Sequence, residues 1–110
     1  MQLPQNLQTL IRKIAEGYKP EKIMLFGSYA EGRATGESDA DLLVIKQTDA
    51  GYFARIREVR KLVQPQTMPL DILVLTPQEY AEKKQWVNHI AYIATKNGIT
   101  VYERKYGKLA

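Results

Sequence analysis

The sequence of 110 residues contains no cysteine and only one histidine, His89. Without cysteine there can be no disulfide framework, no thiolate metal site and no cysteine nucleophile, which is consistent with a reducing compartment. A single histidine excludes a multi-histidine metal centre, and we assign His89 no functional role. The glycine patterns of dinucleotide-binding and P-loop proteins are also absent, so neither class of nucleotide site is expected.

Long apolar segments are absent as well. No run approaches the roughly 20 residues that span a bilayer. The first residues, Met1 to Gln8, lack the charged start and apolar stretch of a secretory signal. We therefore expect no membrane association and a cytoplasmic location.

The composition that remains is typical of a globular domain. Hydrophobic residues make up 45% and charged residues 25% of the chain, whereas a disordered chain would have far fewer apolar residues. The length predicts a single domain over residues 1–110, with 103–110 as a basic tail. Sixteen lysines and arginines against twelve acidic residues give a net charge of +4, which favours anionic partners such as nucleotide phosphates.

Hydrophobic periodicity and turn residues predict an alternation of helices and strands. The expected elements, in chain order, are a helix at 5–16 capped by Gly17, a strand at 23–26, a helical turn at 29–31, a strand at 41–45, a helix at 50–63, a strand at 71–75, a helix at 77–97 with a break near 84–86, and a strand at 99–102. This order predicts an α+β (α/β) fold with a mixed sheet of about four strands flanked by helices.

The helix expected at 50–63 has an apolar stripe that recurs at i, i+4, i+7 and i+11 from Tyr52 onward, so this stripe is expected to be buried. The basic residues between these positions, Arg55 and Arg57 among them, are then expected to face solvent. A solvated helix face is the commoner meaning of such a basic run, so nucleic acid is not expected as a primary partner.

The residues suited to chemistry are Gly27-Ser28, then Asp39 and Asp41 after ten intervening residues, and Asp71 at the start of the next apolar strand. Residues i and i+2 of an extended segment share a face, so Asp39 and Asp41 present two carboxylates together. A cluster of carboxylate oxygens suits Mg²⁺ or Mn²⁺. A glycine after a strand lets the backbone approach a phosphate, and Ser28 and the following amides supply donors.

These residues meet only in one strand arrangement, because Gly27 ends its strand whereas Asp41 and Asp71 begin theirs. The first strand must run antiparallel to the second, and the third parallel to the second, with helix 50–63 as the crossover. Three carboxylates and a phosphate loop then lie at one edge of the sheet. That arrangement suits two metal ions about 3.5–4 Å apart.

The pattern Gly27-Ser28-x10-Asp39-x-Asp41, followed by Asp71 on a strand, resembles the minimal nucleotidyltransferases of the DNA polymerase β superfamily. The residues around these motifs are similar to those of the MNT antitoxins in particular. The resemblance implies a polymerase-β-like fold, two Mg²⁺ ions (or Mn²⁺), ATP as substrate, and transfer of AMP to a tyrosine of a partner HEPN ribonuclease toxin. It implies a hetero-oligomer with that toxin, and a homodimer is also compatible with it.

By the family pattern, Gly27 and Ser28 hold the nucleotide phosphates, Asp39 and Asp41 bind both metals, and Asp71 completes the metal site and helps to deprotonate the acceptor. The sequence departs from that pattern at Glu31, where family members often carry a basic residue. We assign the missing phosphate contact to Arg33, which follows two positions later.

Two other functions fit the same residues. One is a non-catalytic module that masks its partner by contact alone, and the other is nucleotidyl transfer to a small molecule or to RNA. No second domain that would bind such an acceptor is evident in the sequence.

Overall fold

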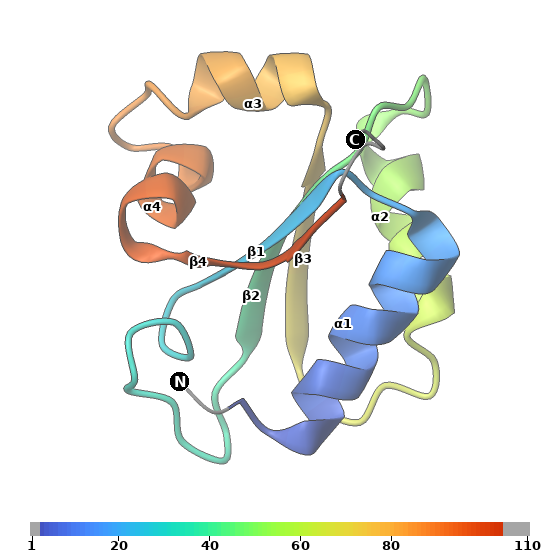
Figure 1. The fold of residues 1–110 in the computed structure, drawn as a ribbon, viewed down its shortest axis with the longest axis vertical. Helices are drawn as coiled ribbons and strands as arrows, with labels where there is room; N and C mark the ends of the chain where they lie inside the picture. The colour runs from blue at the N-terminus through green and yellow to red at the C-terminus, as the bar shows by residue number, and fades with distance from the viewer. Residues whose placement is uncertain (1–2, 105–110) are drawn as a thin grey trace.

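The structure, a computed structural model, describes residues 3–104 and consists of a mixed four-stranded sheet with helices on both faces (Figure 1). The elements in chain order are α1 (Gln5–Tyr18), β1 (Lys22–Phe26), β2 (Ala40–Ile45), α2 (Tyr52–Leu62), β3 (Leu70–Leu75), α3 (Pro77–Lys83), α4 (Ile90–Asn97) and β4 (Ile99–Glu103). Of the basic tail expected at 103–110, Glu103 is the last residue of β4 and Arg104 follows it. Residues 105–110 lie outside the described part of the chain.

The strand order is β3-β2-β1-β4. β1 runs antiparallel to β2 and to β4, whereas β2 and β3 are parallel and are connected through α2. This topology confirms the strand arrangement that the positions of the glycine and the aspartates predict. A parallel pair needs a crossover connection, and α2 provides it.

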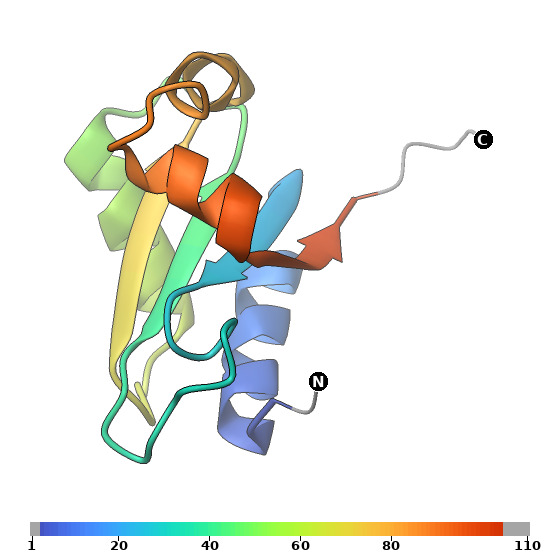
Figure 2. The same cartoon turned by 90° about the vertical axis from the view of Figure 1, so that its left-hand side faces the viewer.

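The two faces of the sheet are covered differently. α1 and α2 pack on one face, where Leu7, Leu10 and Ile14 of α1 are completely buried against β-strand residues. α4 lies across the other face and buries Ala91 and Ala94 against a smaller cluster. Figure 2 shows α4 on the outer side of this second face, above the segment that connects β1 and β2. The second face is therefore the less completely covered one.

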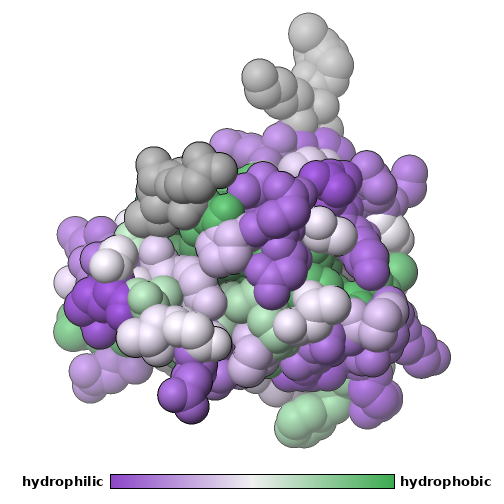
Figure 3. All heavy atoms as spheres, turned by 90° about the horizontal axis from the view of Figure 1, so that it is seen from below, coloured by the Kyte–Doolittle hydropathy of each residue, from purple (hydrophilic) through white to green (hydrophobic). Residues whose placement is uncertain are grey.

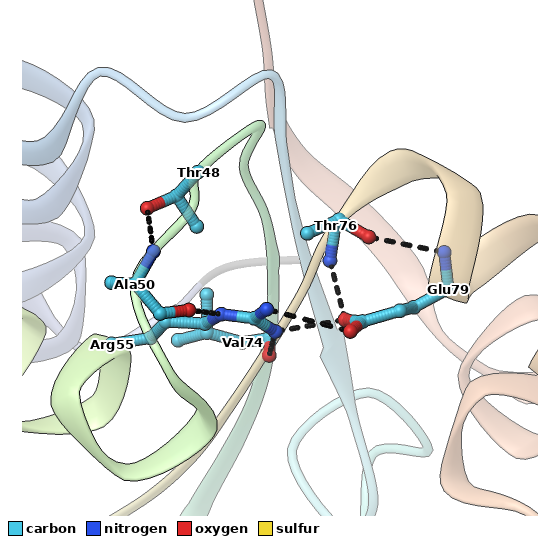
Figure 4. Close-up of polar contacts among 6 residues, drawn as sticks. All are labelled: Thr48, Ala50, Arg55, Val74, Thr76 and Glu79. Atoms are coloured by element: carbon cyan, nitrogen blue, oxygen red, sulfur yellow. Dashed lines mark hydrogen bonds and ion pairs between the residues drawn. The ribbon is translucent and has the colours of Figure 1, made fainter.

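Arg55 of α2 is buried, which corrects the expectation that it faces solvent. Its guanidinium pairs with the Glu79 carboxylate of α3 at 2.8 Å and donates hydrogen bonds to the backbone oxygens of Ala50 and Val74 (Figure 4). The same carboxylate accepts a hydrogen bond from the backbone N–H of Thr76, as the capping box of α3 requires. Arg55 thus ties the two helices to the end of β3.

Three helix details also differ from expectation. α1 continues through Gly17 to Tyr18, and Lys19 takes the left-handed C-cap conformation with φ of 53°. Tyr52 is exposed at the start of α2, because burial begins one turn later. The expected break between α3 and α4 extends from 84 to 89, and His89 ends it as the N-cap of α4, accepting a hydrogen bond from the N–H of Ala91.

Within residues 3–104, no helix has the length and apolar character needed to cross a membrane.

Arg55→Ala is expected to destabilise the protein by about 2 kcal/mol, because it removes hydrogen bonds to a charged group and leaves Glu79 without its partner. Arg57→Ala, on an exposed position of the same helix, is the matched control and should change stability by less than about 0.5 kcal/mol. Denaturant unfolding measures both. Equal midpoints for the two variants would contradict the role given to Arg55.

Candidate functional site

Asp41 and Asp71 are side by side in the sheet. They are register partners on the parallel strands β2 and β3, and Phe26 at the end of β1 is the partner of Asp41 on its other side. Side chains alternate along a strand, so Asp41 shares a face with buried Leu43, and Asp71 with Leu73. Both carboxylates therefore lie on the less covered face, at the end of the sheet where β1 stops.

Gly27 lies directly against the Asp41 carboxylate. Its φ of +75° is a conformation that favours glycine, and a Cβ at this position would collide with Oδ2 of Asp41. The positive φ thus favours glycine here, and a larger residue would also displace the Asp41 carboxylate. The predicted phosphate-loop glycine and the first strand aspartate are brought together.

The segment after Gly27 forms a single helical turn, as expected from the sequence. The N–H of Glu31 donates to the Gly27 oxygen at 3.1 Å, and the N–H of Arg33 donates to the Ser28 oxygen at 2.9 Å. The first amides of such a turn have no acceptor within it. Ser28 therefore stands at the end of the turn where backbone donors are available to an anion.

Asp39 precedes β2 and is exposed. The loop that leads to it is fixed by Ser38, whose side-chain oxygen accepts a hydrogen bond from the N–H of Thr35 at 2.8 Å, while its own N–H donates to the Thr35 oxygen. Sequence reasoning gave Ser38 no role. The signal was present, because serine and threonine commonly stabilise turns through such contacts.

Arg33 is turned toward Glu31. Its guanidinium forms an ion pair with the Glu31 carboxylate at 2.8 Å, and both side chains are exposed. Exposed pairs of this kind contribute little to stability, so a phosphate can compete for the guanidinium at small cost.

The electrostatics of the cluster centre on Asp41. Burial is the largest cause that raises the pKa of its carboxyl, and the negative charges of Asp71 and Asp39 raise the pKa further. Like charges so close destabilise the ionised form unless a cation lies nearby. The charges of Asp71 and Asp39 thus act on the Asp41 carboxyl.

The donor set is appropriate for a divalent cation, because carboxylate oxygens are the ligands that Mg²⁺ prefers. The aspartates share one end of the sheet, yet no group of three acidic, histidine or cysteine side chains among residues 3–104 is already arranged to hold a metal ion. By donor type and register the residues fit such a cation.

Viewed from this end of the sheet, the surface is mostly hydrophilic, with smaller apolar areas between the polar side chains (Figure 3). Phe26 and Leu73, which flank the carboxylates, are only partly buried against the α4 side of the core. Neither residue was singled out from the sequence, because both read as ordinary strand residues there.

Residues 8–106 match the family described as polymerase beta, nucleotidyltransferase. The chain belongs to this family. The match spans almost the whole sequence and confirms the family and the enzyme class that the glycine–serine and aspartate motifs predict. The protein is a nucleotidyltransferase.

Named relatives agree with this assignment. A protein of Methanocaldococcus jannaschii, provisionally named a protein adenylyltransferase, is 33% identical over 69 residues, which cover 63% of this chain and 67% of that protein.

Two solved structures share the fold. One is a Sulfolobus solfataricus protein provisionally named a nucleotidyltransferase, with a TM-score of 0.64 and 19% identity over 91% of this chain and 79% of that one. The other is a complex of a tri-AMPylated Shewanella oneidensis HEPN toxin with its MNT antitoxin; the match has a TM-score of 0.53 and 21% identity, and covers 90% of this chain and 71% of that one. The similarity confirms the expected polymerase-β-like fold.

Asp41→Asn is expected to stabilise the metal-free nucleotidyltransferase at neutral pH, by about 1 kcal/mol or less, because it removes a charge that faces like charges on neighbouring positions. Since folding raises the pKa of Asp41, the wild type loses stability as the pH rises through that pKa. The advantage of the variant should therefore grow as the pH increases from below about 4 toward 7.

Thermal unfolding in the presence of a chelator, as a function of pH, measures this difference. Asp49→Asn, on an exposed loop between β2 and α2, is the control with the same chemical change. An advantage of Asp41→Asn that is constant with pH, or that matches the control, would contradict the account of the cluster.

Proposed function

We propose that this nucleotidyltransferase moves AMP from ATP to a tyrosine hydroxyl of a HEPN-type ribonuclease toxin and thereby acts as its antitoxin. The observation that carries the proposal is the pairing of Asp41 with Asp71 beside Gly27, at the end of the sheet. The provisional name of the archaeal relative and the AMPylated toxin in the Shewanella complex support this choice of group and acceptor. We place the reaction in the cytoplasm, which a cysteine-free sequence suits.

In this proposal, Asp39, Asp41 and Asp71 hold Mg²⁺, with two ions at full occupancy, and Mn²⁺ has the same ligand preference. Bound there, the cations would offset the carboxylate charges and stabilise the negative charge on the phosphates. The repulsion that raises the pKa of Asp41 is the property that such binding would relieve.

The phosphates of ATP are assigned to the turn after β1. Gly27 allows close approach of the backbone, and the amides and hydroxyl at Ser28 supply donors. Arg33 would release Glu31 and pair with a phosphate, since its present partner is an exposed carboxylate. This gives the basic contact that the family often places at the position of Glu31.

The reaction follows from the placement of the acceptor beside Asp71, which is exposed and therefore reachable by a second protein. The tyrosine oxygen attacks the α-phosphorus of ATP and forms a new O–P bond, while the bond from that phosphorus to the bridging oxygen breaks and pyrophosphate leaves. The hydroxyl proton passes to the Asp71 carboxylate. Asp71 is thus assigned both to the metal and to the acceptor.

The test is incubation with α-labelled ATP, Mg²⁺ and the product of the adjacent open reading frame, which the proposal assigns as the HEPN protein, followed by detection of labelled protein on a gel. We expect label on the HEPN protein, and a loss of at least about 100-fold in Asp71→Asn, because even outer residues of metal sites contribute roughly 10–100-fold. Calorimetry should show that Asp71→Asn still binds ATP.

Asp39→Asn/Asp41→Asn serves as the second inactive protein and Asp49→Asn as the active control. Label that survives in Asp71→Asn would overturn the role of that residue. A stable complex that never carries label, and whose toxin stays neutralised by Asp39→Asn/Asp41→Asn, would instead establish masking by contact. Label in RNA or in a small molecule would show that the acceptor is that molecule and not a HEPN protein.

A further inference from the structure

An apolar surface lies outside the catalytic cluster, on the connection before α4 and on the outer side of that helix. It consists of Trp86, Val87, Ile90 and Ile93, which are 55%, 67%, 40% and 37% exposed. We call these four residues the α4 face. Ile90 and Ile93 are one helical turn apart and therefore adjacent on the helix surface. Neighbouring exposed apolar residues that include tryptophan are typical of protein interaction sites.

The helix that carries Ile90 and Ile93 is packed firmly against the sheet. Ala91 and Ala94, on the opposite side of the helix, are completely buried against the sheet. The hydroxyl groups of Tyr80 in α3 and Thr95 in α4 are hydrogen-bonded at 2.6 Å, which links the two helices. Little ordering would thus be needed when a partner binds, and preorganisation favours affinity.

Three lysines, which we call the lysine rim, occur in the segment 77–97 that carries the α4 face. Their ammonium groups lie over aromatic rings, Lys83 over Trp86 at 5.2 Å, Lys84 over Tyr80 and Lys96 over Tyr92. Two acidic residues occur in the segment 77–97. Glu79 pairs with Arg55, so within this segment Glu82 is the remaining acidic residue against the three lysines. The rim of the α4 face is therefore positive.

The α4 face leads toward the catalytic end of the sheet. α4 ends at Gly98, where an added Cβ would lie 2.7 Å from the backbone oxygen of Leu25, two residues before Gly27. From Ile90 to the end of the helix the distance is about 10 Å, at 1.5 Å per residue. Figure 2 shows the same helix above the segment that carries the phosphate turn. A protein bound along α4 would therefore extend toward the segment that carries Gly27.

We infer that the α4 face docks the protein that accepts AMP, and that this partner presents an apolar patch flanked by carboxylates. The inference rests on the proposed function for the identity of the partner. Charge complementarity selects this occupant, because carboxylates would face the lysine rim. A second copy of the chain, related by a two-fold axis, would bring the same lysines together and is disfavoured.

The decisive variants differ only in the sign of a new charge at one exposed position, Val87→Glu and Val87→Lys. Each is mixed with the product of the adjacent open reading frame, in an Asp41→Asn background and without ATP, and the dissociation constant is measured by calorimetry. Both should weaken the complex, and Val87→Glu should weaken it at least about tenfold more than Val87→Lys, because like charges across an interface repel. Trp86→Ser should weaken binding about tenfold or more.

Phe53→Ser, at a 70% exposed position of α2, is the control for loss of an exposed apolar residue and should leave the affinity unchanged. Thermal unfolding establishes that each variant is folded. Any of four results would overturn the inference. They are equal effects of Val87→Glu and Val87→Lys, wild-type affinity in Trp86→Ser, the absence of any complex with the unaltered face, and a homodimer that these changes dissociate.

Binding and AMP transfer are measured separately, so the two proposals fail in different ways. A complex that depends on the α4 face but never receives AMP would support the docking surface and contradict the proposed activity. If all α4-face variants transferred AMP at the wild-type rate and bound the partner with wild-type affinity, the result would support the activity and contradict the docking surface.

Discussion

Two carboxylates occupy neighbouring positions on parallel strands, on the same face as buried aliphatic side chains. Asp41 and Asp71 are register partners, and burial, together with the negative charge of Asp71, raises the pKa of Asp41. Such an arrangement is unfavourable by itself, since like charges and partial burial both oppose ionisation. The other features of the site can be understood from this constraint, because they either bring the two strands into register or leave room for a ligand that compensates the charge.

The topology of the sheet brings the two carboxylates together. α2 is the crossover that makes β2 and β3 parallel, and its Arg55 joins it to Glu79 beyond the far end of β3. The antiparallel β1 brings Gly27 against the Asp41 carboxylate, where no other residue fits without displacement. One face of the sheet is covered by two long helices, whereas the face with the carboxylates carries the short α4. The open face leaves the carboxylates accessible from solvent.

Much of this could be read from the sequence, because it depends on local patterns. Apolar runs and turn residues locate all four strands, and the requirement that Gly27 meet the aspartates predicts the strand directions. Arg55 could not be assigned correctly in that way. Its burial depends on Glu79, 24 positions later, and a charged residue on a helix reads as exposed until such a partner is known. The C-cap at Lys19 was missed because a glycine, the usual residue for that conformation, stands two positions earlier.

The central claim is that the aspartate cluster is an anionic site made for a divalent cation and a nucleotide. Calorimetric titration of the wild type with a non-hydrolysable ATP analogue, with Mg²⁺ and with a chelator, tests it most directly when repeated on Asp39→Asn/Asp41→Asn. The account predicts that tight binding requires Mg²⁺ in the wild type and that the Mg²⁺-dependent part disappears in the double variant. Equal Mg²⁺-dependent binding by both proteins would contradict it.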